Sequence, residues 1–507
     1  MKQIHIKNRL YILPALLFCM NLQSTETTQS NTTHPDTQTE TQVALNHDNQ
    51  VNQNTLDAFN LAVIHKKYDN PKPHNIGSQN NVEWQNIAES YHNPKLQNID
   101  GSPDNSFGPN GRGYTVNQFG TSSQARAVIT LPHNNEIVVG GERENKAVLI
   151  QYTNNSELNR AFGGVSSAGV VVNNNGITAF NTIAIQKNRR IIAAGREVNQ
   201  FALTRYYEDG NLDTDFGNNG KADIQNQGGE ITAIALQGDN IIVSGNDNSG
   251  AMVLARFNSD GILDRNFAPT FHSPKPGIRI TRIGAEARAH ALAIQQDNKI
   301  VVVGSGNQTQ MAIVRYTENG ELDTTFGPDN TGIVTIIIGN EASPAYGVVI
   351  QKDEKIVVVG QSHHLGDGAA VFTTVRLNAD GSLDTSFGNQ GGGVVTTRPQ
   401  GTPYPAFARS VALDEDEKII VMGYVNVDTI SYFTLLRYNT YGVLDTTFGV
   451  NGIQITGVTI NGPNRSTLPV VGTLQNDKEK LVLAGNYVNA INATNNQIAV
   501  ARYLATH

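Results

Sequence analysis

A short motif, Leu-Asp-x-x-Phe-Gly with small substitutions, recurs seven times along this 507-residue chain. Successive motif phenylalanines are 51 to 61 residues apart, at Phe107, Phe162, Phe216, Phe267, Phe326, Phe387 and Phe448. A period of this length indicates repeated supersecondary units, each of which buries its apolar face against its neighbours. The repeat therefore constrains the architecture more strongly than any single residue.

One full repeat can be followed from residue 289 to residue 338. Its apolar, β-branched runs cover residues 289–295, 300–304, 311–316 and 332–338, and Gly, Asn and Asp separate them. Such runs predict four short strands joined by turns, because they are too short for helices and show no helical period. Four antiparallel strands per repeat are typical of a propeller blade.

The end of the chain predicts how the ring closes. A second strand that ends in glycine occurs seven times, at residues 137–141, 191–195, 241–245, 300–304, 356–360, 419–423 and 481–485. The last repeat stops at Arg502 and Tyr503 in its third strand, and a lone strand at about residues 111–117 precedes the first full repeat. We therefore predict an all-β, seven-bladed propeller over residues 101–507, closed by the N-terminal strand, which leaves no unpaired edge between the chain ends.

Connection lengths differ between the two ends of the predicted ring. The residue after the third-strand Arg or Gln lies six residues before the motif Leu in all six complete repeats. The second-strand Gly, in contrast, lies 10 to 17 residues before that Arg or Gln. Rigid scaffolds display binding loops where their connections vary, so we expect function at this variable end, which we call the mouth.

A charged pair also recurs, with an arginine eight residues before the motif acid. Where Gln151 replaces the arginine, Asn159 replaces the acid, so both charges disappear together. We interpret the pairs as structural salt bridges, with the last one formed across the ring closure. The pairs are Arg205 with Asp213, Arg256 with Asp264, Arg315 with Asp323, Arg376 with Asp384, Arg437 with Asp445, and Arg502 with Asp104.

Four polar residues occupy nearly equivalent places where first strands begin, close to the mouth: Arg126, His290, Tyr346 and Arg409. They are either simple blade edges or a partly cationic site for an anionic ligand. We predict no catalytic residue, metal ligand or cofactor. A metal at His363, His364 and Asp367, or calcium at the Asp-Gly turns 209–210 and 380–381, is the less favoured alternative, because adjacent histidines point apart and alternating acidic ligands are missing.

Segments such as DGNLDTDFG, NGELDTTFG and QQDNKIVVVG resemble the delta-60 repeat of large secreted bacterial proteins, which is similar to NHL-type propeller repeats. The resemblance covers about residues 101–507. It implies a propeller, usually in exported or surface proteins, and it implies no catalytic residues.

The N-terminal residues predict export. Residues 1–22 combine three basic residues with a short apolar run, as a signal peptide does. Cys19, the only cysteine, lies in that run, and Phe18 before it disfavours a lipoprotein signal, so we expect its removal. Residues 23–100 read as a disordered Thr-, Asn- and Gln-rich tether, with short helices possible at 56–68 and 84–91. No later segment is predicted to span a membrane.

Charge narrows the function further. The net charge is −8, which disfavours nucleic acid as a partner. We predict a secreted, periplasmic or cell-surface scaffold, expected to be a monomer and not an enzyme, that binds a protein or a glycan. The alternatives are a propeller hydrolase or lyase with its site in the axial funnel, and a passive structural protein of the surface.

Overall fold

The computed structural model describes residues 4–6 and 100–505, except 165, 198–199, 225–227, 270–275, 308, 340, 364–365, 400–403, 428–429, 458–466, 476–477 and 489–495. Two compact units divide the chain, one formed by Met1–Lys7 with Ile87–His507 and the other by Asn8–Asn86. All described residues belong to the first unit. The predicted signal peptide apart from residues 4–6, and the predicted tether apart from residue 100, lie outside the described residues. The two segments where short helices were predicted lie outside them as well.

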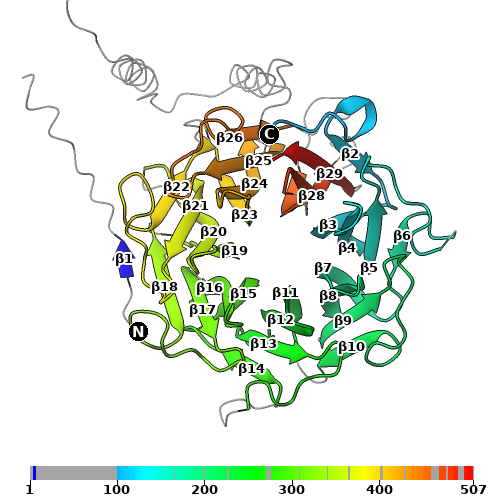
Figure 1. Cartoon of the computed structure of the whole chain (residues 1–507), viewed down its shortest axis with the longest axis horizontal. Coiled ribbons are helices and arrows are strands. Elements are labelled where there is room, and N and C mark those ends of the chain that lie inside the picture. Colours follow the sequence, from blue (N-terminus) through cyan, green and yellow to red (C-terminus); the bar gives the residue numbers. More distant parts are fainter. Residues whose placement is uncertain are drawn as a thin grey trace, which may run out of the picture. The chain divides into compact units, whose positions relative to one another are not determined.

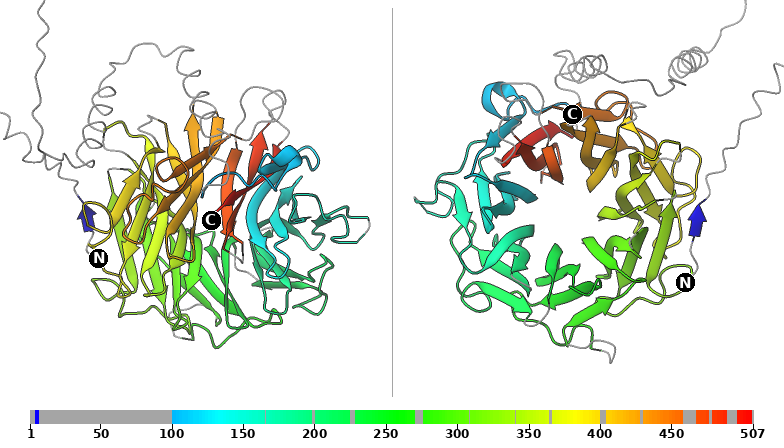
Figure 2. Two further views of the ribbon diagram at one scale, coloured as in Figure 1. Left: turned by 45° about the horizontal axis from the view of Figure 1, so that its top comes forward. Right: turned by 180° about the vertical axis from the view of Figure 1, so that it is seen from behind.

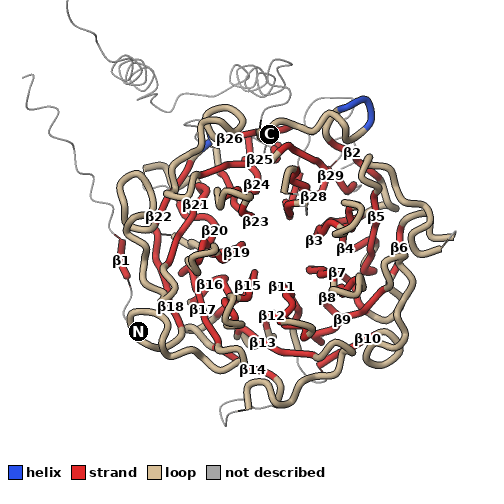
Figure 3. The backbone as a smooth tube through the Cα atoms, in the orientation of Figure 1, coloured by secondary structure: helices blue, strands red, loops and turns tan. Residues whose placement is uncertain are grey.

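Seven antiparallel four-stranded sheets are arranged around one axis, which confirms the predicted seven-bladed β-propeller (Figure 1). Strands account for the blades, and loops join them at both ends (Figure 3). A single turn of 3-10 helix, η3 (Pro109–Gly111), precedes the first strand of the ring. Within the described ranges, no helix has the length and apolarity needed to cross a membrane.

The first four blades run in chain order, each from its inner to its outer strand. Their strands are β3 (Ser123–Thr130), β4 (Ile137–Arg143), β5 (Lys146–Tyr152) and β6 (Val170–Val172) in blade 1; β7 (Ile177–Ile185), β8 (Ile191–Glu197), β9 (Gln200–Tyr206) and β10 (Lys221–Ile224) in blade 2; β11 (Glu230–Gln237), β12 (Asn240–Asn246), β13 (Met252–Phe257) and β14 (Ile278–Thr281) in blade 3; β15 (Ala287–Ile294), β16 (Ile300–Gly306), β17 (Gln310–Tyr316) and β18 (Ile333–Ile338) in blade 4.

The last three blades follow the same order, but blade 7 takes its outer strand from the beginning of the domain. The strands are β19 (Ala345–Ile350), β20 (Ile356–His363), β21 (Ala370–Leu377) and β22 (Val394–Thr397) in blade 5; β23 (Ala406–Leu413), β24 (Ile419–Val427), β25 (Ile430–Tyr438) and β26 (Ile453–Thr456) in blade 6; β27 (Thr467–Leu474), β28 (Lys480–Val488), β29 (Asn496–Leu504) and β2 (Tyr114–Asn117) in blade 7. A short strand, β1 (Ile4–Ile6), lies parallel to the edge strand β18 of blade 4.

Both ends of the domain build blade 7, as predicted. Strand β2 pairs antiparallel with β29, and Figure 2 shows the cyan and red strands side by side. No turn of the chain connects these two strands, and backbone hydrogen bonds join the segments beside them instead. The amide of Gly101 donates to the carbonyl of Leu504 at 2.7 Å, and the amide of Leu504 donates to the carbonyl of Ser102 at 3.0 Å. The ring is therefore closed by backbone hydrogen bonds between segments about 400 residues apart in the chain.

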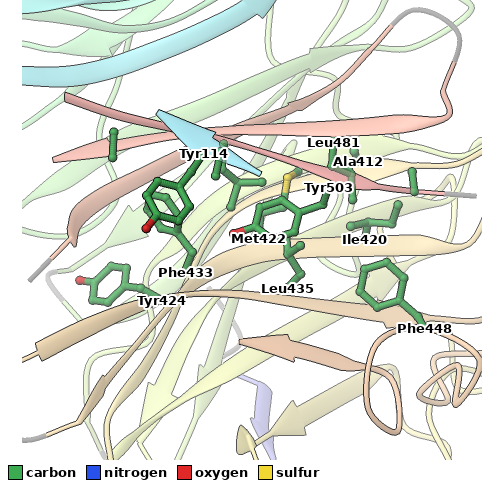
Figure 4. Close-up of a cluster of buried hydrophobic side chains, with 14 of the residues drawn as sticks. Tyr114, Ala412, Ile420, Met422, Tyr424, Phe433, Leu435, Phe448, Leu481 and Tyr503 are labelled. Atoms are coloured by element: carbon green, nitrogen blue, oxygen red, sulfur yellow. The ribbon is translucent and has the colours of Figure 1, made fainter. Parts of the chain in front are cut away.

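The apolar core lies between neighbouring blades. At the junction of blades 6 and 7, Met422, Phe433 and Leu435 of blade 6 pack with Leu481 and Tyr503 of blade 7, all at most 1% exposed. Tyr114 from the closing strand β2 joins this cluster (Figure 4). The closing strand thus contributes apolar burial as well as backbone pairing, so the ends of the chain are held together in two ways.

The motif phenylalanine is an inter-blade contact. A Cβ on Gly320 of blade 4 would lie 2.5 Å from the Phe267 ring of blade 3, and Gly320 has a φ of +81°. The equivalent glycine meets the preceding motif ring at Gly210, Gly261, Gly381, Gly442 and Gly101. Six of the seven motif phenylalanines therefore lie under the third turn of the next blade, where a glycine leaves room for the ring. In blade 1, Ser156, with a φ of +77°, holds the equivalent turn position.

The structure brings all six charged pairs together. The arginine Nε lies 2.7–2.9 Å from an aspartate Oδ2 in every pair. Each guanidinium carbon also lies 4.4–4.8 Å above the centroid of the motif phenylalanine of its own repeat. The same guanidinium donates to a backbone carbonyl of the next blade, for example from Arg256 to Glu318 at 2.9 Å. The pair thus joins two blades.

Blade 1 is the neutral exception. Asn159 Nδ2 donates to Gln151 Oε1 at 2.8 Å, in the place of the ion pair. Blade 1 also contacts blade 2 through His133, whose Nδ1 lies 3.0 Å from the Glu208 carboxylate of blade 2. The amide pair preserves the local hydrogen bond, but it supplies no guanidinium for the following blade.

We expect Asp323→Ala to destabilise the ring strongly, because it leaves the buried guanidinium of Arg315 without its carboxylate. The loss should be about 3–5 kcal/mol, as for other broken buried pairs. Asp297, whose side chain is 52% exposed, is the control, and its replacement by Ala should cost less than about 1 kcal/mol. Urea or thermal unfolding measures both changes; two equally small effects would contradict the structural role of the pair.

Acid should weaken the pair of Arg437 with Asp445. Burial raises the pKa of Asp445, but hydrogen bonds from Thr447 and Lys418 and the charge of Arg437 outweigh it and bring the pKa to about 2. The folded carboxylate holds its proton less tightly than the unfolded one, so its contribution is present above the unfolded pKa and is lost as the pH falls to about 2. We expect the free energy of unfolding to fall between about pH 5 and pH 2, and Asp445→Asn to reduce that slope.

Candidate functional site

A β-bulge occurs at the same place in the inner strand of every blade. In blades 1 to 6 one residue is left out of the pairing with the second strand at this place: Arg126, Asn181, Thr232, His290, Tyr346 and Arg409. The bulge explains the glycine that ends the predicted second strands. A Cβ on Gly304 would lie 1.8 Å from the carbonyl oxygen of Arg288, two residues before His290. Bulges commonly re-aim a side chain near a functional site.

In blades 2 and 3 the bulged side chain ties the blade to its neighbour. Asn181 Nδ2 donates to the carbonyl of Ile231 in blade 3 at 2.9 Å. Thr232 Oγ1 donates to the carbonyl of Ala289 in blade 4 at 2.9 Å. At these two junctions, the position that leaves the pairing carries a structural hydrogen bond.

In blades 4, 5 and 6 the bulged side chains stack on one another instead. The rings of His290 and Tyr346 have centroids 4.9 Å apart, and the Arg409 guanidinium carbon lies 4.0 Å above the Tyr346 ring. Phe407 and Tyr424 of blade 6 stack with centroids 4.9 Å apart, and Arg409 Nη2 donates to the Tyr424 hydroxyl at 3.1 Å. We call these five residues the mouth sector.

The mouth sector combines rings with hydrogen-bonding groups. Tyr424 is buried, whereas His290, Tyr346, Phe407 and Arg409 are partly exposed. Within the described part of the chain, Arg409 has no carboxylate partner, and its guanidinium is fixed by the three rings around it. A cation held above aromatic faces keeps its remaining N–H groups available for a ligand. The sector can therefore stack on a flat ligand and donate hydrogen bonds to it.

Arg126 lies apart from this sector, although the sequence grouped it with the other three. It belongs to blade 1, and blade 7 lies between it and Arg409. Its Nη2 lies 3.2 Å from Glu142 Oε2 and 3.3 Å from Gln124 Oε1. The structure thus brings His290, Tyr346 and Arg409 together and leaves Arg126 paired with a carboxylate of its own blade.

His290 is held in its neutral form. Its burial, followed by the positive charges of Arg409 and Arg288, lowers its pKa from 6.5 to about 4. At neutral pH the ring therefore carries one N–H donor and one acceptor nitrogen. Arg409 is consequently the charged group of the mouth sector.

Phe407 and Tyr424 were missed by the sequence analysis. Tyr424 follows the second-strand glycine Gly423, and Asn246 holds the same position in blade 3. Asn246 Oδ1 accepts a hydrogen bond from the backbone of Ala289 at 2.6 Å, so residues at this position reach the next blade. The recurring second-strand glycine could have indicated the bulge opposite it, and also that the residue after the glycine reaches the next blade.

The alternative metal positions have other partners. His363 Nε2 lies 3.4 Å from Glu341, and Asp367 binds Arg398 at 2.7 Å; His364 lies outside the described residues. Asp209 and Asp380 accept hydrogen bonds from the amides two residues later, within their own turns. Among the side chains that the structure describes, no group of three or more His, Cys, Asp or Glu is placed to hold a metal ion.

The chain is similar to a known propeller family. Four of its repeats match the family described as "Domain of unknown function (DUF5122) beta-propeller", over residues 237–267, 295–326, 351–387 and 415–448. These segments cover parts of blades 3 to 6. No curated protein matches the sequence.

Several solved structures are similar to this chain at low sequence identity. Virginiamycin B lyase from Staphylococcus aureus is 11% identical with a TM-score of 0.44, over 77% of this chain and 99% of that one. The BP39L lectin from Burkholderia pseudomallei is 13% identical with a TM-score of 0.46, over 75% and 96%. Polysaccharide lyase Uly1 is 10% identical with a TM-score of 0.42, over 75% and 90%. Similarity at this level carries no argument about function.

The environment of His290 predicts its titration. Because the folded pKa of about 4 lies below the usual 6.5, the ring should stay neutral from about pH 8 to pH 5, and its protonation should oppose folding as the pH falls from about 6.5 to 4. We expect the imidazole NMR signals to titrate near 4 in the wild type. In Arg409→Leu the pKa should rise in part, since burial remains; an unshifted wild-type pKa of about 6.5 would contradict this environment.

Proposed function

We propose that this protein is an exported propeller that binds a protein or glycan ligand at the mouth sector, without catalysis. The supporting observation is the difference between equivalent positions of one ring. Asn181 and Thr232 use the bulge to join blades, whereas His290, Tyr346 and Arg409 use it to build a partly exposed stack. An inter-blade hydrogen bond like those of Asn181 and Thr232 would satisfy the fold in blades 4, 5 and 6 too. These three blades carry a partly exposed stack instead, and this difference favours a ligand.

Export is part of the proposal. It is supported by the basic and apolar N-terminal residues and by the resemblance to the delta-60 repeat of secreted bacterial proteins. Once residues 1–22 are removed, the chain has no cysteine, so it needs no disulfide in an oxidising compartment and offers no thiol for oxidation.

Variable connections at one end also support a binding role. The loops between second and third strands emerge at the mouth, and they differ in length from blade to blade, whereas the first hairpin turn at the opposite end is nearly constant. A spacer that only shields a surface has no reason to vary one end. A passive surface role is therefore less favoured than binding.

A lyase is the second candidate, because the mouth sector contains a neutral imidazole, a phenol and a guanidinium. Elimination next to a carboxylate needs a base, an acid and a cation that neutralises the carboxylate, and these three groups match that need. A base with a pKa of about 4 accepts protons poorly at neutral pH, and this weakens the candidate. Formation of a conjugated carbon–carbon double bond in uronic-acid polymers would reveal it.

The proposal is tested by a thermal-shift screen of the full-length protein against glycans, peptides and small anions, with divalent metals and a chelator as further conditions. A ligand should raise the stability of the folded state by about 2.7 kcal/mol at a hundredfold excess over Kd. Arg409→Ala and Tyr346→Ala should each abolish the shift.

Arg126→Ala is the matched control. Arg126 occupies the equivalent bulge but is paired with Glu142 outside the mouth sector, so its variant should keep the full shift. Loss of binding in Arg126→Ala but not in Arg409→Ala would place the site elsewhere. A complete absence of shifts with every probe would favour the passive surface role.

A further inference from the structure

A polar groove of about 600 Å³ lies at the mouth end of blades 2, 3 and 4. Its walls come from the end of β8, the start of β11, the β12–β13 loop and the start of β15. The side chains that line it include Arg196, Glu230, Asn248, Ser249, Glu286 and Arg288. The groove is thus built by three blades and opens on the same end of the ring as the mouth sector.

The charges of the groove nearly cancel. Two arginines face three carboxylates, since Asp247 also lines the groove. Arg288 Nε binds Glu286 at 2.7 Å, and Asp247 accepts hydrogen bonds from Ser249 and Ala251 within its loop. Such a lining attracts neither a polyanion nor an apolar ligand. It offers many donors and acceptors at close spacing, which suits a ligand rich in hydroxyl groups.

Two groups of the groove still have free hydrogen-bonding capacity. Arg196 and Asn248 are exposed, and within the described ranges the side chain of neither makes a hydrogen bond or an ion pair. A guanidinium presents its donors as a planar fork, and an amide presents a donor beside an acceptor, so each can engage two neighbouring hydroxyls of one sugar ring.

The groove and the mouth sector both include residues of β15. Arg288 of the groove and His290 of the mouth sector are two residues apart on that strand. Between them, the carbonyl of Ala289 accepts hydrogen bonds from Thr232 and Asn246 of blade 3, which fixes the bulge in place. The positive charge of Arg288 also contributes to the lowered pKa of His290. The two surfaces therefore lie next to each other at blade 4.

We propose that the groove and the mouth sector form one extended site for a net-neutral oligosaccharide. The aromatic rings of the mouth sector stack on one sugar, and the groove binds the hydroxyls of the following residues of the same chain. Stacking on Tyr346 and Phe407 uses the apolar faces of the sugar, whereas Arg196 and Asn248 use its polar edge. This inference rests on the proposed binding function and names its ligand as a polymer of uncharged sugars.

The test measures Kd for the full-length protein with neutral saccharides, built on glucose, galactose or N-acetylglucosamine, from monosaccharide to hexasaccharide. A galacturonic acid series of the same lengths is the charged comparison. In the series that binds, we expect the hexasaccharide to bind at least about tenfold more tightly than the monosaccharide, because added hydrogen bonds accumulate along the groove.

Arg196→Ala combined with Asn248→Ala should abolish that gain with length, so that the hexasaccharide binds no more tightly than the monosaccharide. Both residues are exposed, so the double variant should fold normally, and an unchanged melting temperature checks this. Arg160→Ala, at an exposed arginine on the opposite end of blade 1, is the control and should keep the full gain. Tyr346→Ala should weaken binding at every length.

The outcomes separate this inference from the proposed function. If saccharides bind but affinity does not grow with length, or the groove variant keeps the gain, the extended site is wrong while the mouth sector stands. If the galacturonic acid series binds more tightly than every neutral series, the ligand is not neutral. If no saccharide binds and a peptide does, the glycan assignment is overturned and the protein is a protein-binding propeller.

Discussion

The ring depends on one repeated junction, in which an arginine binds an aspartate of its own blade, lies over the phenylalanine of its own repeat, and donates to the next blade. A buried guanidinium is costly unless its charge and its N–H groups are satisfied. At Arg437 the partners are Asp445 at 2.9 Å, Asp100 at 2.7 Å and the carbonyl of Ala505 at 2.6 Å. Those last two partners come from opposite ends of the domain. The same residue type that joins ordinary blades therefore also holds the closure.

Much of this architecture could be predicted because the informative contacts are local in the repeat. The arginine and its acid are eight residues apart, the turn glycine is required by a ring of the preceding repeat, and each recurs often enough to be recognised. Covariation within the chain was equally informative: Gln151 with Asn159 forms the neutral hydrogen bond where both charges are absent. Because the repeats are similar, equivalent positions could be compared within the one chain.

The candidate site was predicted only in part, because it is made of contacts between repeats that are not repeated. His290, Tyr346 and Arg409 were recognised as equivalent positions, but equivalence alone does not say which neighbours touch. Arg126 has the same position and charge as Arg409, yet a glutamate across the β3–β4 hairpin pairs with it. Arg409 instead meets Phe407 and Tyr424, aromatic residues that equivalent strands lack. Side-chain partners two strands or one blade away decide the chemistry of each bulge.

The two ends of the ring differ in how much change they tolerate, and this difference follows from the position of the same junction. The arginine, its acid and the turn glycine all lie at the end with constant connections, so that end carries the inter-blade charge contacts and tolerates little change. At the mouth, blades are joined by neutral hydrogen bonds such as that between Asn246 and Ala289, and the backbone bulge faces a glycine of the second strand. A bulged residue can change there without breaking a charged contact between blades. This freedom explains how one ring can keep seven similar blades and still place an aromatic stack in three of them.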